Sequence, residues 1–232
     1  MIEPIHDIPA VTFVGRGKLA RAVAELWEER GGSIASMVGS NESWEAKGLV
    51  FEATTPGAAV ANLSKCLKAG TPFVTGTTGW HDSMSDLAKL AQEHRATGFW
   101  STNFSPGVHA LNAIAQHASQ VMTQLEGYTA HIREVHHVHK LDAPSGTAIT
   151  LKQAAMTGGL SKETPIRSER QGEVVGLHAL AWDSVHDSVV LQHEAKNRGG
   201  FAEGAVLALR WIWQQHLQGH HGLFTMTDLF KP

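Results

Sequence analysis

Short apolar runs alternate with helical patterns along the first part of the chain. Residues 10–14, 33–38, 49–53, 72–75 and 98–101 predict strands, because these runs are short, largely apolar and bounded by glycine or polar residues. Helical patterns follow the first, third and fourth runs. The order β-α-β-β-α-β-α-β favours an α/β fold with a doubly wound parallel sheet, which binds ligands at the carboxyl ends of its strands.

The rest of the chain mixes both patterns. A helix is predicted at 108–124, a strand at 128–138, and a second helix from Ser145, as its N-cap, to about Met156. Further strands are predicted at 174–181 and 188–195, an amphipathic helix at 201–213, and an exposed loop at 157–172. The regular alternation of the first part is therefore not continued here.

Composition excludes several classes of protein. The net charge of −3 and the pI near 6.6 leave no basic surface for nucleic acid or an anionic membrane. No apolar run approaches the roughly 20 residues of a membrane helix, and the N-terminus does not resemble a signal peptide. The single cysteine, Cys66, is expected to be a buried thiol. We expect a cytoplasmic protein of one large domain or two small ones.

A glycine turn follows the first predicted strand. Gly15-x-Gly17-x-x-Ala20 matches the dinucleotide-binding pattern, in which the glycines permit a tight turn and close approach to a pyrophosphate. The pattern alone is weak, but the loops after the other strands are also small, polar and rich in glycine. Backbone and hydroxyl contacts from such loops suit a dinucleotide, so the sheet is expected to be Rossmann-like.

The end of the second predicted strand bears on the choice of cofactor. An acidic residue about 20 positions after the glycine turn normally binds the ribose 2′-hydroxyl of NAD, but Val38-Gly39-Ser40-Asn41-Glu42 lacks it or has it displaced. NADPH or NADH therefore remains possible, with a slight preference for NADPH. A 2′-phosphate could be accommodated by Arg16, Lys18, Ser40 or Asn41.

Three histidines and a lysine lie within Glu134-Val135-His136-His137-Val138-His139-Lys140. Period-two alternation divides the histidines between two faces of the predicted strand, and no carboxylates at ligand spacing complete a metal site, so no metal is expected. His136 and Lys140 share a face and offer a proton donor and a fixed cation. A straight strand would hold them about 13 Å apart, so both reach one ligand only if the chain turns near Leu141.

The helix start at Ser145 adds an anion site to this segment. The N–H groups of Gly146 and Thr147 would lie in the first helical turn, where a carboxylate is favoured. These features indicate an acidic substrate, although a capped surface helix after a polar strand would look the same locally.

Residues 134–148 contain the motif Glu-x-His-His-x-x-Lys-x-Asp-Ala-Pro-Ser-Gly-Thr-Ala, which resembles that of the 4-hydroxy-tetrahydrodipicolinate reductase (dihydrodipicolinate reductase) family. Segments 76–79, 103–108, 172–178 and 198–205 support the resemblance in the expected order. It implies NAD(P)H-dependent reduction of 4-hydroxy-tetrahydrodipicolinate to tetrahydrodipicolinate in the diaminopimelate route of lysine biosynthesis.

The resemblance also implies roles for individual residues. His136 would be the proton donor and Lys140 would stabilise the anion formed, while the substrate, a small dicarboxylate, would contact His137, Ser145, Gly146, Thr147 and Arg198. The nucleotide would contact Gly15, Gly17, Lys18, Leu19, Ser40, Thr54, Gly76, Thr77, Thr78, Asn103 and Phe104. Residues 1–106 and 205–232 would form the dinucleotide-binding domain, and residues 107–204 an α+β domain for substrate binding and assembly into a homotetramer.

The sequence departs from the family pattern in the nucleotide region. Lys18-Leu19-Ala20 replaces Arg-Met-Gly, Glu52-Ala53-Thr54 replaces Asp-Phe-Thr, and His109 replaces an asparagine. Two alternatives stay open: a reductase of another small acidic imine or semialdehyde, and a nucleotide-sensing or histidine-rich metal-binding protein without catalysis.

Overall fold

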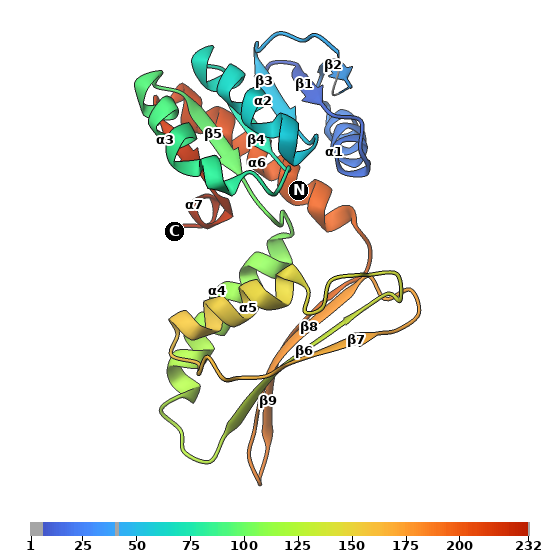
Figure 1. The fold of residues 1–232 in the computed structure, drawn as a ribbon, viewed down its shortest axis with the longest axis vertical. Coiled ribbons are helices and arrows are strands. Elements are labelled where there is room, and N and C mark those ends of the chain that lie inside the picture. Colours follow the sequence, from blue (N-terminus) through green and yellow to red (C-terminus); the bar gives the residue numbers. More distant parts are fainter. Residues whose placement is uncertain (1–6, 40–41, 232) are drawn as a thin grey trace. The chain divides into compact units, whose positions relative to one another are not determined.

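The computed structural model describes residues 7–39 and 42–231. These residues divide into two compact units, one from residues up to 104 together with 201 onward, and the other from residues 105–200 (Figure 1). The prediction at Ser40 lies outside the described residues.

The first unit is built on a six-stranded sheet in the order β10-β5-β4-β3-β1-β2, in which all pairs are parallel. Its strands are β1 (Val11–Val14), β2 (Ile34–Val38), β3 (Leu49–Glu52), β4 (Phe73–Thr75), β5 (Thr97–Trp100) and β10 (Gly222–Phe224). Its helices are α1 (Lys18–Glu29), α2 (Pro56–Lys68), α3 (Met84–Glu93), most of α6 (Gly199–Leu217), α7 (Met226–Leu229) and the 3₁₀ turn His81–Ser83. The predicted doubly wound parallel sheet is confirmed.

Two apolar layers hold the helices on opposite faces of this sheet. Trp27 of α1 and Leu209 of α6 are fully buried with Phe13 and Phe51 on one face. The other face packs α2 and α3 through a second cluster that includes Leu63. Strand order reverses between β1 and β3, whose carboxyl ends therefore flank the crevice where such folds bind ligands.

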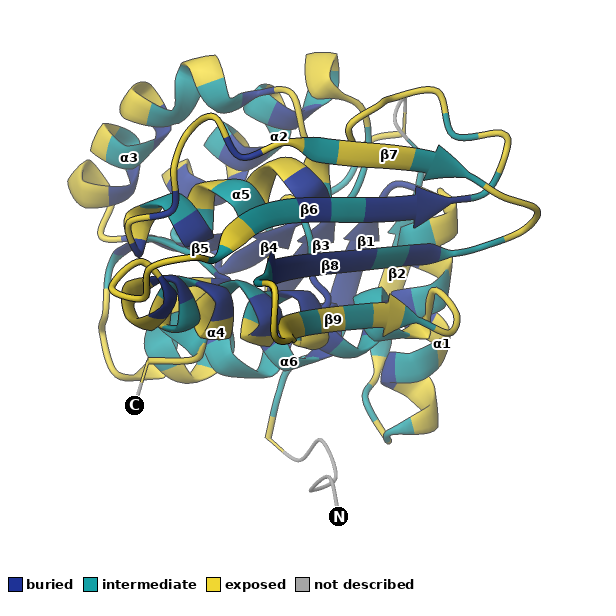
Figure 2. Ribbon diagram, turned by 90° about the horizontal axis from the view of Figure 1, so that it is seen from below, coloured by how far each residue is buried: buried dark blue, intermediate teal, exposed yellow. Residues whose placement is uncertain are grey.

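The second unit is a mixed sheet with two helices. Strands β6 (Thr129–His136), β7 (Ile166–Arg170), β8 (Gly176–Asp183) and β9 (Ser188–Ala195) lie in the order β7-β6-β8-β9, with only β6 and β7 parallel. Helices α4 (Pro106–Met122) and α5 (Gly146–Thr157) pack on each other and on one face of this sheet. Burial is greatest in β8 and in the carboxyl half of β6, and the edge strands β7 and β9 are more exposed (Figure 2).

The prediction of an exposed loop at 157–172 is wrong. Its second half forms β7, which pairs with β6 from Ile132↔Ile166 to His136↔Arg170. The apolar alternation that predicts a strand is missing from Ile166-Arg167-Ser168-Glu169-Arg170, because an edge strand buries little apolar surface. The short elements β10 and α7 were not predicted either, and β6 ends at His136 rather than at Val138.

Candidate functional site

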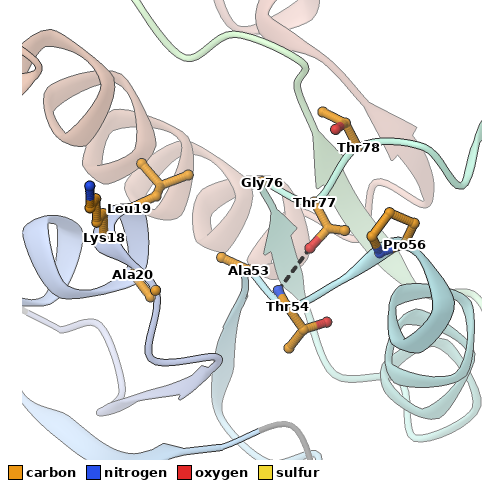
Figure 3. A pocket seen from close by; sticks show the side chains of 10 residues that line it. Lys18, Leu19, Ala20, Ala53, Thr54, Pro56, Gly76, Thr77 and Thr78 are labelled. Carbon is orange, nitrogen blue, oxygen red and sulfur yellow. Dashed lines mark hydrogen bonds between the residues drawn. The ribbon is translucent and has the colours of Figure 1, made fainter. Parts of the chain in front are cut away.

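A pocket of about 280 Å³ opens at the carboxyl ends of β1, β3 and β4 (Figure 3). It contains seven of the residues predicted to bind a nucleotide: Gly17, Lys18, Leu19, Thr54, Gly76, Thr77 and Thr78. Ala20, Ala53 and Pro56 complete its lining. Ala20 belongs to the glycine-turn pattern and Pro56 to the loop after the third predicted strand, whereas Ala53 was not predicted to contact a ligand. The pocket lies where the strand order reverses, as expected of this fold class.

The glycine turn has the geometry that a close ligand requires. Gly15 has a φ of +115°, and a Cβ there would lie 2.1 Å from the carbonyl oxygen of Ala53. Gly17 precedes α1 without a side-chain cap, and no heavy atom of the other described residues, its chain neighbours aside, lies within 4 Å of the place of its missing Cβ. Open space in front of an uncapped helix start is suited to a phosphate, so these residues fit a dinucleotide.

Thr54 and Thr77, which line this pocket, belong to a hydrogen-bond network around Glu52. Glu52 is fully buried and accepts hydrogen bonds from the hydroxyl of Thr75 at 2.6 Å and from the N–H of Thr54 at 3.1 Å. The Thr54 N–H also donates to the hydroxyl of Thr77 at 2.8 Å, the contact drawn in Figure 3. Glu52 thus joins the ends of β3 and β4, a role that the sequence did not reveal.

Asn103 and Phe104 do not line this pocket. Phe104 is buried among Phe51 and Phe99 in the core, and its ring lies 3.3 Å from where a Cβ on Gly76 would be. Its contact with the nucleotide region is therefore through Gly76.

Glu42, after β2, pairs with Arg16 at 2.6 Å, and Arg16 also donates to the carbonyl oxygen of Met37 at 3.1 Å. An acidic group thus stands near the end of β2, displaced beyond its usual position.

A buried polar cluster occupies the second unit, where the carboxyl end of β6 meets the start of α5. Glu134 and His136 point to the same side of β6, and His178 lies opposite Glu134 on β8. Glu134 is fully buried, and His136 and His178 are nearly so. Pairing of distant strands creates this cluster, so the sequence pattern could not include His178.

Glu134 has hydrogen-bonding partners on three sides. Its carboxylate contacts Nδ1 of His136, accepts from the Arg170 guanidinium at 3.1 Å, and accepts from the backbone N–H of Ser145 at 3.3 Å. Burial raises the pKa of Glu134, but hydrogen bonds from Ser168, His136 and Arg170 outweigh it and hold this pKa below its usual value. Glu134 is therefore ionised, and Nδ1–H of His136 donates to it.

Opposing influences act on the protonation of His136. Burial lowers its pKa, the hydrogen bond and charge of Glu134 raise it, and Lys140 and Arg170 lower it, with a net decrease. For His178, burial followed by the charge of His136 lowers the pKa to about 4. Both rings are therefore neutral at pH 7 in the free protein.

Glu134, His136 and His178 also offer three possible metal ligands within 4.8 Å of one another. The expectation that no carboxylate accompanies the histidines is therefore wrong. However, the guanidinium of Arg170 already lies against Glu134 and provides the positive charge that balances it. This cluster has the composition of a proton-transfer site more than that of a metal centre.

The chain turns immediately after His136, earlier than at Leu141. The N–H of Lys140 donates to the carbonyl oxygen of His137 at 3.1 Å, and Arg170 donates to the carbonyl oxygens of Lys140 and Asp142. This turn keeps Lys140 close enough to lower the pKa of His136. Its Nζ pairs with Asp142 at 2.7 Å.

Ser145 caps α5, as predicted: its hydroxyl accepts from the N–H of Ala148 at 3.2 Å. The same hydroxyl lies 3.1 Å from Nε2 of His178, and Ser145 is only 1% exposed. His137 lies in the turn after β6, and Arg198 in the exposed segment before α6. The roles of both in substrate binding stay predictions.

Comparison with known proteins identifies the family. The N-terminal and C-terminal families described as "Dihydrodipicolinate reductase" match residues 38–104 and 107–230. A protein of Christiangramia forsetii named 4-hydroxy-tetrahydrodipicolinate reductase is 31% identical over 241 residues, covering 95% of this chain and 99% of that protein. The chain belongs to the dihydrodipicolinate reductase family.

Other members agree with this assignment. The Stenotrophomonas maltophilia K279a protein named 4-hydroxy-tetrahydrodipicolinate reductase is 37% identical over 170 residues, covering 73% of this chain and 66% of that protein. A dipicolinate-bound dihydrodipicolinate reductase from Paenisporosarcina sp. TG-14 has the same fold, with a TM-score of 0.76 at 18% identity over 97% of this chain and all of that one. The resemblance seen in residues 134–148 is therefore confirmed, and the chain is an oxidoreductase. Among the described residues, no helix is long and apolar enough to cross a membrane.

Proposed function

We propose that this protein catalyses the NAD(P)H-dependent reduction of 4-hydroxy-tetrahydrodipicolinate to tetrahydrodipicolinate in the diaminopimelate route of lysine biosynthesis. The observation that carries the proposal is the grouping of His136, Lys140 and the start of α5 in the part of the chain that matches the family's C-terminal half. The substrate would be bound by the unit of residues 105–200, and the nucleotide by the unit that combines residues up to 104 with residues from 201 onward.

Backbone groups would hold the nucleotide. Gly17 and the first turn of α1 would contact the pyrophosphate, and Thr54, Gly76 and Thr78 would line its path. When bound, the nicotinamide supplies the hydride for the reduction. We propose that both NADPH and NADH serve, with a slight preference for NADPH, because Arg16 offers a cation to a 2′-phosphate while Glu42 offsets it.

The substrate carboxylates would bind at the start of α5. The positive end of this helix favours an anion, and Gly146 leaves open space where a Cβ would be. Asp142 already contacts two of these groups in the free protein: hydrogen bonds from Lys140 and from the N–H of Gly146 lower the pKa of its carboxyl. A substrate carboxylate would therefore compete with Asp142 for these groups.

His136 would supply the proton. It is neutral in the free protein because its pKa is lowered, but a dianionic substrate beside it favours its charged form. Substrate binding would therefore be accompanied by proton uptake on Nε2. Lys140 would stabilise the negative charge that forms on the substrate when it is reduced.

The test is to follow oxidation of NADPH and NADH with the freshly made product of dihydrodipicolinate synthase as substrate. We expect substrate-dependent oxidation of both nucleotides. Absence of turnover with either would contradict the proposal, and equal or faster turnover with another small acidic imine would favour the alternative reductase.

We further propose a cytoplasmic homotetramer formed through the sheet of the second unit. In support, Val190 of β9 exposes 53% of its surface. Sedimentation analysis should give a mass four times that of the chain, and a monomeric mass would contradict this assembly.

A further inference from the structure

Glu134 carries a negative charge although its side chain is fully buried in the second unit. An isolated carboxylate loses its solvation on burial, so it stays ionised only with compensating partners. Three different segments of the second unit supply them: His136 on the same strand, Arg170 on β7 and the N–H of Ser145 at the start of α5. One carboxylate thus links the reacting histidine to the helix start that would bind the substrate.

Arg170 connects the same carboxylate to the turn that carries Lys140. Its guanidinium donates to Glu134, to the carbonyl oxygen of Lys140 at 3.3 Å and to that of Asp142. Arg170 is held in turn by the pairing of β7 with β6, opposite His136. A planar group with five donors in a fixed geometry is suited to hold a carboxylate and a turn at once.

Nε2 of His136 lies beside Gly176 of β8. A Cβ on Gly176 would lie 3.1 Å from this atom, so a side chain at this position would crowd Nε2. Because Glu134 fixes Nδ1 as the protonated nitrogen, Nε2 is the atom that gains and loses the transferred proton.

We propose that Glu134 and Arg170 are positioning residues, which together fix the tautomer of His136 and the placement of Lys140 for proton transfer. This inference rests on the proposed role of His136. The groups that face His136 are Glu134 from β6, Lys140 from the following turn, Arg170 from β7 and His178 from β8.

The two residues have opposite electrostatic effects on His136. Loss of the negative charge in Glu134→Gln removes the influence that raises the histidine pKa, so this pKa should fall further. Loss of the positive charge in Arg170→Met should raise it. Opposite shifts are the signature of the proposed arrangement, because general loosening of the fold would not produce them.

A second ion pair joining the same two strands provides matched controls. Arg133 of β6 and Glu169 of β7 pair at 2.8 Å on the other face of the sheet, where both side chains are more than two-fifths exposed. Glu169→Gln and Arg133→Met therefore remove equivalent charges away from His136.

The experiment is ¹⁵N NMR of histidine-labelled protein across a pH titration, with the His136 signal assigned by its loss in His136→Asn. We expect the Nδ1–H tautomer in the wild type, a lower pKa in Glu134→Gln, a higher one in Arg170→Met, and no change in the two controls. Glu134→Gln should also lower kcat about 10²-fold, whereas the controls keep kcat within about twofold.

An Nε2–H tautomer in the wild type would overturn the proposal even if the variants fail to fold. Equal effects of Glu134→Gln and Glu169→Gln would overturn it as well. The spectra need no substrate, so failure of the proposed reaction is recognised separately, as absence of turnover in the wild type.

Discussion

Among the described residues, each unit of the protein completely buries one glutamate, and the two glutamates have different surroundings. Glu52, at the end of β3, is surrounded by neutral donors from Thr54, Asn62 and Thr75. Glu134, near the end of β6, contacts a histidine and an arginine. A carboxylate among hydroxyls organises loops, whereas a carboxylate between an imidazole and a guanidinium also controls a proton. Substitutions in the two regions should therefore alter different kinetic quantities.

The largest effect is expected at the residues that Glu134 and Arg170 position. His136→Ala and Lys140→Ala should each lower kcat by about 10²–10⁴, or roughly 3–5 kcal/mol of barrier, because each removes a group that acts on the developing charge. Steady-state kinetics should show this loss while circular dichroism shows an intact fold. Near-full activity in both variants would refute the assigned roles.

His178 should make stability depend on pH. The unfolded chain takes up a proton on this histidine below about pH 6.5, but the folded protein does so only near pH 4. The free energy of unfolding should therefore fall by up to about 3 kcal/mol as the pH drops through this window. Urea unfolding between pH 7 and 4 should show a shallower decline in His178→Gln, and an unchanged decline would contradict this account.

Glu52→Gln should weaken nucleotide binding without affecting proton transfer. The amide introduces a donor among groups that already donate, so the ends of β3 and β4 lose their shared acceptor at a cost of about 1–3 kcal/mol. We expect the KM for the nucleotide to rise about tenfold or more, with the pH profile of kcat unchanged. A shift in the pH profile of kcat in Glu52→Gln would mean that Glu52, like Glu134, affects proton transfer, and would contradict the separate roles of the two glutamates.

Thr147→Ala is expected to have the smallest effect. Thr147 lies in the first turn of α5, where the substrate carboxylate would bind. The KM for the substrate should rise severalfold while the KM for the nucleotide stays the same. A change confined to the nucleotide KM would place the substrate elsewhere.

The nucleotide region was largely predictable because its residues are neighbours in sequence. Each strand is followed directly by its loop, so the loops that hold Gly17, Thr54 and Gly76 could be placed at one edge of the sheet from the order of strands. The nucleotide contacts of individual residues came from the family resemblance and stay predictions. The network under Glu52 was not predictable, because it depends on side chains that meet across two strands.

The second unit shows what local patterns omit. His136 and the helix start at Ser145 were evident from alternation and capping, but His178 and Arg170 reach the site only through strand pairing. Arg170 lies in a polar segment that was predicted to be a loop. An edge strand made mostly of charged and polar residues lacks the alternating apolar positions from which a strand is predicted in sequence.

The central distinction is tested most directly by the pH dependence of kcat/KM for the wild type, Glu134→Gln and Glu52→Gln, measured with the same substrate and nucleotide. Because His136 must be protonated to act, activity should decline as the pH rises through its pKa. This decline should move to lower pH in Glu134→Gln and stay in place in Glu52→Gln. A decline at the same pH in all three proteins would contradict the proposed role of Glu134.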